Sequence, residues 1–316
     1  MTGAGLAAGA AKAAVVFGEA LIDDFAGEQI VGGAPFNVAR HLSAFMAPCL
    51  MLTRIGDDRP GRLVRAEFER FAMSEAGLQV DPIEDTGRVL VERGPRGHRF
   101  SILPNQAYDF IDPASALAAV GAVDAGIVVF GMLAQRNDTA RAALTAVLDA
   151  GPALRFLDLN LRDGQYDERG VTRSLQLANI VKVNEEELQV LFGWFFQIKP
   201  DDPPLAADDV HASCQALLQM FSLDALIVTL GHRGAVYFGG DGQVLHGRDT
   251  PAPPFVIDTV GAGDAFSAIF LLGKMRGWPL DLALGRANEF AGAICAIPGA
   301  VPGDLGFYDK WMTRWR

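Results

Sequence analysis

The sequence predicts an α/β protein whose central, mainly parallel sheet has helices on both faces. Short apolar runs, typical of buried strands, alternate with longer segments of helical periodicity along most of the chain. Hydrophobic residues make up 50% of the 316 residues, which is ample for the core of one large domain. Two short β-like runs interrupt the alternation around a Gly-Pro-Arg-Gly turn, and they predict a small antiparallel insertion.

The N-terminal half is expected to contain two strand–helix pairs. The strands are the apolar runs 13–17 and 49–55, each followed by glycine. The first helix is expected at Pro35, because proline suits the first helical turn. A second helix is expected over 67–76 and to end at Gly77, since glycine commonly terminates helices.

The antiparallel insertion is expected to be a hairpin of residues 88–92 and 98–103. Together with residues 24–31, this hairpin would form a small sheet that covers a site as a lid. We therefore expect one domain over 13–316, with the lid segments about 24–31 and 86–104 inserted into it.

The C-terminal half resumes the alternation of strands and helices. The expected strands are short runs rich in Val, Ile and Leu, and the helices follow them at intervals marked by glycine, proline and aspartate. Strands are expected at 126–130, 154–159, 180–183 and 225–230, helices at 138–148, 211–221, 265–275 and 280–297, and a hairpin at 235–238 with 243–246.

The composition excludes several classes of protein. The net charge is −11 and no dense cluster of Lys and Arg occurs, so binding to nucleic acid or to an anionic membrane is not expected. No apolar run reaches the roughly 18 residues of a membrane span. Residues 1–12 lack the basic start and leucine-rich run of a signal peptide, and we expect a flexible tail there.

Cysteine usage indicates the compartment. Cys49, Cys214 and Cys295 are far apart and odd in number, and the sequence contains no Cys-x-x-Cys. This pattern favours free thiols in a reducing compartment over a disulfide framework. A cytoplasmic location is therefore expected.

Residues 258–266, Asp-Thr-Val-Gly-Ala-Gly-Asp-Ala-Phe, contain the strongest candidate site. The glycines Gly261 and Gly263 allow a ligand to approach the backbone, and the free N–H groups of the helix that follows suit a phosphate. Asp264 would repel such a ligand, unless it serves as a base for a hydroxyl that attacks the phosphoryl group. The alternative is that Asp264 only caps the helix.

A second glycine-rich element, 32–39, precedes the first helix. A pair of glycines before a helix lets a small ligand approach, and Asn37 offers it a donor and an acceptor. Asp23 follows the first strand, at the strand end where ligands of α/β proteins usually bind. The alternative for 32–39 is an ordinary strand–turn–helix with a polar first turn.

Asn184 and Glu187 follow the strand 180–183. Their spacing is that of a capping box, in which the two side chains satisfy the start of the next helix. A functional interpretation is that they order water around Mg²⁺, because this cation prefers oxygen ligands and keeps several waters.

These motifs, taken in order, resemble the ribokinase/PfkB family of carbohydrate kinases over residues 15–303. Four elements carry the resemblance: 32–39, Asn184-x-x-Glu187, Thr229-x-Gly231-x-x-Gly234 and 258–266. The sequence has no Walker A motif, so it is not a P-loop enzyme.

The resemblance implies a ribokinase-like sheet with a β lid, and transfer of the ATP γ-phosphoryl group to a sugar hydroxyl. The residues it assigns are Asp264 as the base, Gly261, Ala262 and Gly263 as the anion hole, Asp23, Gly33 and Asn37 for the sugar, and Thr229, Gly231, Gly234 and Asn288 for ATP. The implied cofactors are ATP and Mg²⁺, with Asn184 and Glu187 as indirect metal contacts. Asp258 lies where many members help to hold a monovalent cation, which leaves K⁺ activation open.

The segments 18–23, 33–37 and 158–162 resemble the fructokinase branch. Arg162 would contact a phosphate or an acidic group, since guanidinium groups suit bidentate contacts with oxyanions; the alternative is a surface arginine paired with an acid. Phe36 stands where fructokinases usually carry a small residue. It either narrows the sugar pocket or packs in the core.

Other hypotheses remain open. One is a kinase for another sugar, a sugar acid or a nucleoside, as in the ribokinase, 2-keto-3-deoxygluconate kinase and adenosine kinase types. Another is a non-catalytic binding or regulatory protein on the same fold, because a fold does not fix a function. The expected partners are ATP and a small-molecule sugar. The first lid segment is short, which leaves a lid-mediated homodimer open.

Overall fold

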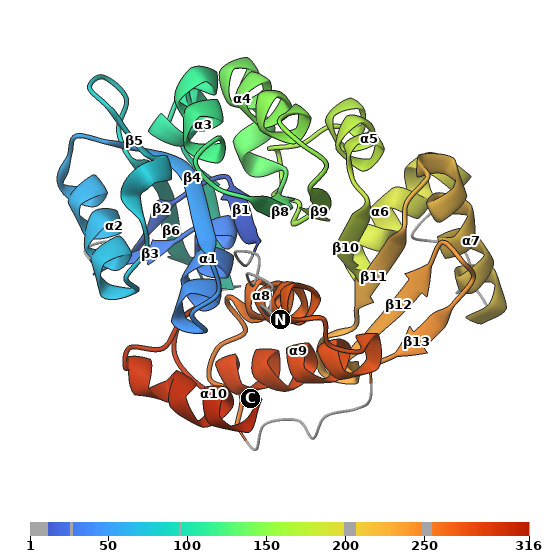
Figure 1. Cartoon of the computed structure of the whole chain (residues 1–316). Helices are drawn as coiled ribbons and strands as arrows, with labels where there is room; N and C mark the ends of the chain where they lie inside the picture. The colour runs from blue at the N-terminus through green and yellow to red at the C-terminus, as the bar shows by residue number, and fades with distance from the viewer. Residues whose placement is uncertain (1–11, 26–27, 95–96, 199–206, 248–254, 316) are drawn as a thin grey trace, which may run out of the picture.

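The computed structural model describes residues 12–25, 28–94, 97–198, 207–247 and 255–315. The predicted N-terminal tail lies outside these residues except for Lys12, as do residues 26–27 and 95–96 of the two predicted lid segments. Within the described residues, the predicted α/β architecture is confirmed: a large sheet lies between layers of helices (Figure 1).

The main sheet has nine strands among the described residues, in the order β13-β12-β11-β10-β9-β8-β1-β4-β5. Neighbouring strands from β5 to β11 are parallel, whereas β11–β12 and β12–β13 pair antiparallel. The strands are β1 (Ala13–Phe17), β4 (Cys49–Gly56), β5 (Leu78–Asp81), β8 (Ala125–Phe130), β9 (Leu154–Asp158), β10 (Ile180–Asn184), β11 (Ala225–Thr229), β12 (Ala235–Gly239) and β13 (Val244–His246).

Helices cover both faces of this sheet because its strands are apolar on both sides. In β1, Ala14 and Val16 belong to one core layer, and Val15 and Phe17 belong to the other. The first layer includes α1 (Ala34–Ala44), α2 (Arg59–Arg70), α8 (Ala262–Arg276), α9 (Leu280–Ile294) and α10 (Asp309–Arg314). The second includes α3 (Pro113–Val120), α4 (Asp138–Asp149), α5 (Glu168–Leu177), α6 (Glu185–Phe196) and α7 (Ala207–Phe221). Short 3₁₀ turns occur at Glu75–Gly77, Ala107–Phe110, Leu133–Gln135, Gly231–Arg233 and Leu305–Tyr308.

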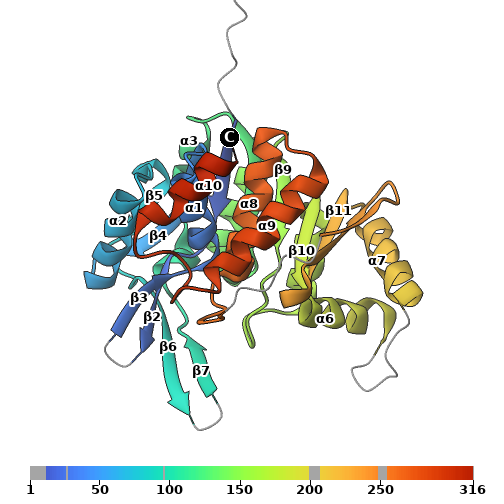
Figure 2. The same ribbon diagram turned by 90° about the horizontal axis from the view of Figure 1, so that it is seen from below.

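A separate four-stranded sheet projects from the body of the molecule (Figure 2). It consists of β2 (Leu21–Phe25), β3 (Glu28–Gly32), β6 (Gly87–Gly94) and β7 (Gly97–Ile102), in the order β3-β2-β6-β7. The predicted hairpin of β6 and β7 is confirmed, and the segment after β1 pairs with it as expected. The function of this small sheet as a lid stays a prediction.

The predicted helix over 67–76 was placed wrongly. Helix α2 begins at Arg59, where the Asp58 side chain accepts a hydrogen bond of 2.6 Å from the Gly61 N–H, and it ends at Arg70. The chain then reverses at Ala72, whose φ is 50°. The first two turns of α2 are rich in arginine and contain proline and glycine, so their helical pattern is weak in the sequence. Helices α3, α5 and α10 and strand β5 were not predicted.

The order of the strands determines where a ligand binds. From β1 the chain adds β4 and β5 on one side, and it then returns to add β8 to β13 on the other. Ligands of such sheets bind outside the carboxyl ends of the strands, next to the point where the order reverses. Glu19 follows β1, and Asp23 lies in β2, the next strand along the chain. Arg162 lies in the loop after β9, and Asn184 ends β10.

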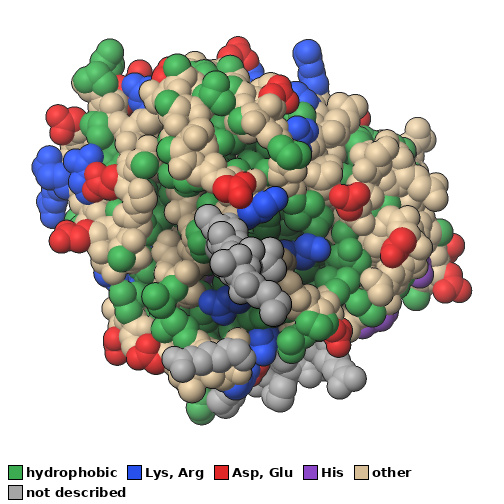
Figure 3. Space-filling model, viewed as in Figure 1, with side chains coloured by type: hydrophobic (Ala, Val, Ile, Leu, Met, Phe, Trp, Pro, Cys, Tyr) green, Lys and Arg blue, Asp and Glu red, His purple; other side chains and the backbone are tan. Residues whose placement is uncertain are grey.

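Two properties of the whole molecule agree with the composition. Among the residues that the structure describes, every helix is too short or too polar to span a lipid bilayer. On the face shown in Figure 3, basic side chains lie in small groups among apolar and acidic ones.

Candidate active site

The start of helix α8 has the geometry of an anion site. Gly261 occupies the N-cap position with φ 77°, a left-handed conformation that favours glycine. A Cβ at this position would lie 2.4 Å from Cβ of Ala300, so a larger residue does not fit. No side chain caps the start of this helix. The Ala262 N–H donates over 3.3 Å to the Thr259 carbonyl, and the other N–H groups of the first turn suit a negatively charged ligand.

Asp264 lies in the first turn of α8, at the third helical position. Because Gly261 is the N-cap residue, the alternative that Asp264 caps the helix is wrong. The Asp264 carboxylate instead accepts a hydrogen bond at Oδ2 from Nδ2 of Asn37, with a distance of 2.6 Å. Two residues of separate sequence motifs, 227 positions apart, thus meet at one point.

The pKa of Asp264 suits a base at neutral pH. The pKa of this carboxyl group is raised to about 6, and burial is the main cause. The nearby Asp158 carboxylate also raises it, whereas the hydrogen bond from Asn37 and the charges of Lys182 and Arg162 lower it. The carboxylate is thus largely ionised at pH 7, yet basic enough to accept a proton in a reaction.

A buried ion pair lies beneath the first turn of α8. Nζ of Lys182 is 2.8 Å from Oδ2 of Asp158, and the Ser267 hydroxyl donates a 2.7 Å hydrogen bond to the same oxygen. Burial lowers the pKa of Lys182, but the adjacent Asp158 carboxylate outweighs it and the pKa is raised overall. A Cβ on Gly263 would lie 3.3 Å from this Nζ. The ammonium group of this ion pair, whose charge Asp158 balances, is thus held under the candidate anion site.

Two further carboxyl groups lie beyond the end of β1. Burial raises the pKa of Glu19 to about 7 and that of Asp23 to about 6. Arg162 is exposed, and its charge lowers the pKa of both groups and of Asp264. The structure therefore brings Asp23, Arg162 and Asp264 into one electrostatic environment, as the sequence predicted, and adds Glu19 to them.

Glu19 is expected to make stability depend on pH. Its pKa is raised from 4.5 to about 7 in the folded protein, so its contribution to stability is present below pH 4.5 and is lost as the pH rises through 7. We compare the free energy of unfolding of Glu19→Gln with that of the wild type at each pH. This difference should be more favourable to the variant at pH 8 than at pH 4.5, by ~3 kcal/mol. Urea unfolding across this pH range measures the difference. Glu186→Gln, at an exposed position on α6, is the control and should keep the wild-type pH dependence.

The glycine-rich element 32–39 has two structural functions. Gly33 has φ 107°, and a Cβ there would lie 2.5 Å from the Glu19 carbonyl oxygen, so glycine permits α1 to pack against the chain after β1. Phe36 is fully buried and stacks on Phe68 with 5.2 Å between ring centroids. Of the two alternatives for Phe36, packing in the core is correct. A contact between Gly33 and a substrate stays a prediction.

Of the four residues expected at the nucleotide, the structure brings two into contact. Gly234 has φ 85°, and a Cβ there would lie 3.2 Å from Nδ2 of Asn288. Asn288 is buried, and Nδ2 has no hydrogen-bond partner among the described residues. Thr229 ends β11 and donates 3.2 Å to the Val183 carbonyl, whereas Gly231 is exposed with φ 59°. Nδ2 is closed off from solvent by the surrounding protein, so a contact between Asn288 and a nucleotide stays a prediction.

Asn184 and Glu187 form the capping box that their spacing predicts. The Glu187 N–H donates 2.8 Å to Asn184 Oδ1, and the Asn184 N–H donates 2.9 Å to Glu187 Oε2. The second oxygen of Glu187 accepts 2.8 Å from the Leu161 N–H, and this bond fixes the loop that carries Arg162. The described residues contain no cluster of three His, Cys, Asp or Glu side chains that could hold a metal. The predicted contact of this pair with Mg²⁺ through water stays a prediction.

Asp258 stabilises the loop before α8. One carboxylate oxygen accepts 3.0 Å from the Val260 N–H, and the other accepts 3.1 Å from the Gly299 N–H. The carboxylate therefore connects the loop to the segment that packs on Gly261. Its predicted contact with a monovalent cation stays untested.

Comparison with known proteins identifies the family. The model of the pfkB family of carbohydrate kinases matches residues 9–304. The chain belongs to this family. As a pfkB carbohydrate kinase, it uses ATP to phosphorylate a carbohydrate, so the predicted enzyme class is confirmed and a non-catalytic binding protein is not supported.

Individual relatives of this pfkB kinase include fructokinases. The chain is 29% identical to a fructokinase of Klebsiella pneumoniae over 90% of this chain and 95% of the relative. A double mutant of Vibrio cholerae fructokinase, solved with fructose, ADP and potassium ion, shares the fold with a TM-score of 0.74 at 24% identity, covering 92% of this chain and 94% of that one. An uncharacterized sugar kinase of Pyrococcus horikoshii in complex with ATP is 26% identical, with a TM-score of 0.73 and coverage of 96% and 98%.

Sequence reasoning about this pfkB kinase missed four polar residues near the base. Glu19 and Asp158 stood inside quoted motifs without an assigned function. Lys182 gave a clear signal, because a lysine within the apolar strand Ile180–Asn184 must have a buried partner. Arg40, which lies on the buried face of α1, likewise needs a buried partner for its charge. Nothing in the sequence indicated what the partners would be.

Proposed function

We propose that this kinase transfers the γ-phosphoryl group of ATP to a hydroxyl group of fructose, with Asp264 as the general base. One observation carries this proposal. A half-buried carboxylate whose pKa is raised to about 6 lies in the first turn of a helix that no side chain caps, where the reacting hydroxyl and phosphoryl groups would meet.

In the proposed mechanism, Asp264 Oδ1 accepts the proton of the acceptor hydroxyl as its oxygen attacks the γ-phosphorus and the bond to ADP breaks. Asn37 holds Oδ2 of the same carboxylate at 2.6 Å and fixes its orientation. The backbone N–H groups of Gly261, Ala262 and Gly263 stabilise the charge on the transferred group, for which the Ala262 N–H exchanges its 3.3 Å bond to Thr259. The ammonium group of the Lys182–Asp158 ion pair lies beneath them. Positioning and electrostatics supply most of the rate enhancement of such a reaction.

We assign Asp23, Gly33, Asn37 and Arg162 to the sugar. The second N–H of the Asn37 amide remains for a sugar hydroxyl, since an amide nitrogen has two donors. Asp23 accepts hydrogen bonds from sugar hydroxyl groups, and the exposed Arg162 holds an oxyanion or hydroxyl at the mouth of the site. The adenine side of ATP is assigned to Thr229, Gly231, Gly234 and Asn288.

Two cations belong to this proposal. Mg²⁺, when bound with ATP, neutralises the phosphate charge, and Asn184 and Glu187 would hold its waters. The loop that Asp258 stabilises would hold K⁺ beside the anion hole. Both assignments rest on donor chemistry, because the oxygens at these positions suit hard cations.

Fructose is proposed because curated fructokinases align with most of the chain, and because Phe36 is fully buried in the core. The test is an ADP-release assay with fructose, ribose, 2-keto-3-deoxygluconate, adenosine and inosine. We expect the highest kcat/KM with fructose. A higher value for another acceptor would overturn the proposed substrate while leaving the proposed base intact, and ADP release that is independent of every acceptor would contradict both.

A further inference from the structure

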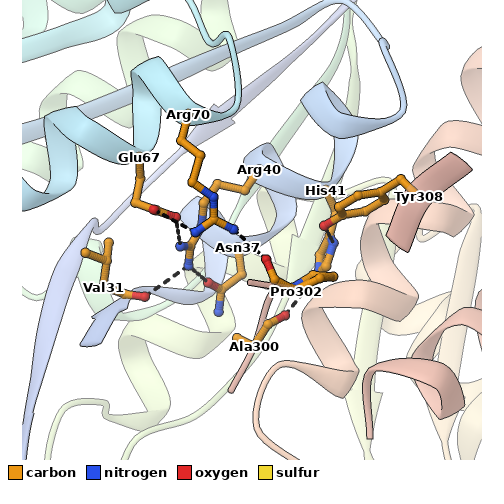
Figure 4. Close-up of polar contacts among 9 residues, drawn as sticks. All are labelled: Val31, Asn37, Arg40, His41, Glu67, Arg70, Ala300, Pro302 and Tyr308. Atoms are coloured by element: carbon orange, nitrogen blue, oxygen red, sulfur yellow. Dashed lines mark hydrogen bonds and ion pairs between the residues drawn. The ribbon is translucent and has the colours of Figure 1, made fainter. Parts of the chain in front are cut away.

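Arg40 is a buried arginine on helix α1, one helical turn after Asn37. Its Nη2 donates to Oδ1 of Asn37 and, over 3.1 Å, to the carbonyl of Val31 in strand β3. Its Nη1 donates over 2.7 Å to Oε2 of Glu67 on α2 (Figure 4). One guanidinium group therefore connects the small sheet, α2 and the amide that contacts the candidate base.

The position of Arg40 determines which end of the Asn37 amide faces Asp264. A guanidinium group has donors only, so it can be bonded by the amide oxygen but not by the amide nitrogen. With Oδ1 held by Arg40, Nδ2 must point to the Asp264 carboxylate. The flipped amide would place two donors together at Arg40 and two acceptors together at Asp264, which is unfavourable at both ends.

Arg40 is itself held firmly in place. Its guanidinium group stacks over the Phe36 ring, 4.8 Å from the centroid. Glu67 also accepts a 3.0 Å bond from Arg70, and this second arginine limits the positions that the carboxylate can take. The departure from the fructokinase pattern at Phe36 thus gains an explanation, since the ring supports the arginine that contacts Asn37.

We propose that Arg40 is a positioning residue of the phosphoryl transfer: it fixes the Asn37 amide so that Nδ2 holds one oxygen of Asp264 and the other oxygen faces the acceptor hydroxyl. This inference rests on the proposed function of Asp264. Arg40 acts through Asn37 and does not contact the reacting groups.

The effect of removing Arg40 on the pKa of Asp264 depends on the groups around this carboxylate. The groups that face it are Asp158 on β9, Lys182 on β10, Arg162 after β9 and Glu19 after β1, together with Asn37 on α1. The bond from Asn37 lowers the pKa of Asp264. If the amide loses its orientation, that pKa rises, and the deprotonated base is lost at a higher pH than in the wild type.

The experiment is a double-mutant cycle read as the pH dependence of kcat/KM, which reports the free enzyme. Arg40→Met should move the acidic limb upwards by about one pH unit, the equivalent of one lost hydrogen bond to a charged group. In the Asn37→Ala background, Arg40→Met should cause no further shift. An unshifted limb in the single variant, or an equal shift in both backgrounds, would overturn the proposal, because the latter would be a direct effect of the charge.

Two controls separate positioning from folding. Glu67→Gln keeps an acceptor for Arg40 and should leave the acidic limb in place. If Arg40→Met does not fold because Glu67 is left unpaired, Arg40→Met with Glu67→Met removes the pair as a unit and should show the same shift. If Asn37→Ala is too slow for kinetics, ¹³C NMR of the Asp264 carboxyl, assigned with Asp264→Asn, measures the same pKa.

The outcome is distinguishable from a failure of the proposed function. If Asp264→Asn retains wild-type kcat, the base is misassigned and the inference about Arg40 fails with it. If Asp264→Asn is inactive while Arg40→Met keeps the wild-type acidic limb, only the inference about Arg40 fails.

Discussion

Asp264→Asn is expected to lower kcat by ~10²–10⁴-fold, the usual cost of removing a general base. The change keeps the size of the side chain and an acceptor oxygen for the 2.6 Å bond from Asn37, so the first turn of α8 should stay in place. In the proposed mechanism ATP contacts the backbone of this turn rather than the carboxylate, and its Kd should therefore change little. Steady-state kinetics with fructose and calorimetric titration with ATP measure the two quantities.

Asp112→Asn is a suitable control for this prediction. Asp112 caps α3 by accepting a 2.8 Å bond from the Ser115 N–H, and α3 belongs to the opposite core layer. Its replacement should affect stability and leave kcat unchanged. If Asp264→Asn retained kcat within a factor of about three, Asp264 would not be the base, and Glu19, whose pKa is raised to about 7, would be the next carboxylate to test.

The parts of this protein that the sequence predicts well are those in which the interacting residues are close together in the chain. The strand 180–183 is visible as an apolar run, and the capping box of Asn184 and Glu187 lies within a single turn. The N-terminus of α8 is equally local, since Gly261 and Asp264 are three residues apart. Family resemblance supplied what local pattern could not, namely that the motif of Asn37 and the motif of Asp264 serve one site.

Tertiary pairs account for what was missed. Lys182 and Asp158 lie on neighbouring strands and meet Ser267 from α8, a combination that no spacing in the sequence defines. Arg40 meets Glu67 across two helices, and the start of α2 was itself not predicted. In each case the sequence shows that a charged residue is buried, but the identity of its partner depends on how the layers pack.

The two glycines of the anion site looked equivalent in the sequence, and the structure separates them. Gly261 has φ 77°, and a Cβ there would lie 2.4 Å from Cβ and 2.5 Å from Cα of Ala300. A Cβ on Gly263 would meet no backbone atom within 4 Å and a single side-chain atom, Nζ of Lys182 at 3.3 Å. Substitution at Gly261 should therefore be much the more damaging of the two.

Ala300 cannot easily move to relieve this clash. Its carbonyl oxygen lies 3.2 Å from Nε2 of His41, and Nδ1 of His41 lies 2.8 Å from the Tyr308 hydroxyl (Figure 4). Burial lowers the pKa of His41 to about 3, so the ring is neutral and carries one N–H. A carbonyl oxygen only accepts, so Nε2 must be the donor and Nδ1 must accept from Tyr308. Asp258 holds the preceding residue, Gly299, from the other side.

Gly261→Ala is therefore expected to lower both stability and activity. The left-handed conformation costs a residue with a Cβ about 1–2 kcal/mol, and overpacking against a fixed neighbour adds about 1–3 kcal/mol. Urea unfolding should show a loss of about 2–5 kcal/mol. Where the variant remains folded, kcat should fall by ~10²-fold, because the displaced first turn no longer directs its N–H groups at the transferred phosphoryl group.

Gly277→Ala is a control that separates the cost of the left-handed backbone conformation from the effect of the clash with Ala300. Gly277 ends the same helix with φ 67°, and a Cβ there would have no atom within 4 Å, so this variant carries the conformational cost without the clash. It should lose about 1–2 kcal/mol of stability and keep its kcat. If Gly261→Ala lost no more stability than Gly277→Ala and kept wild-type kcat, the contact with Ala300 would not determine the anion site. A loss of kcat confined to Gly261→Ala would tie catalysis to the backbone position that only glycine can occupy.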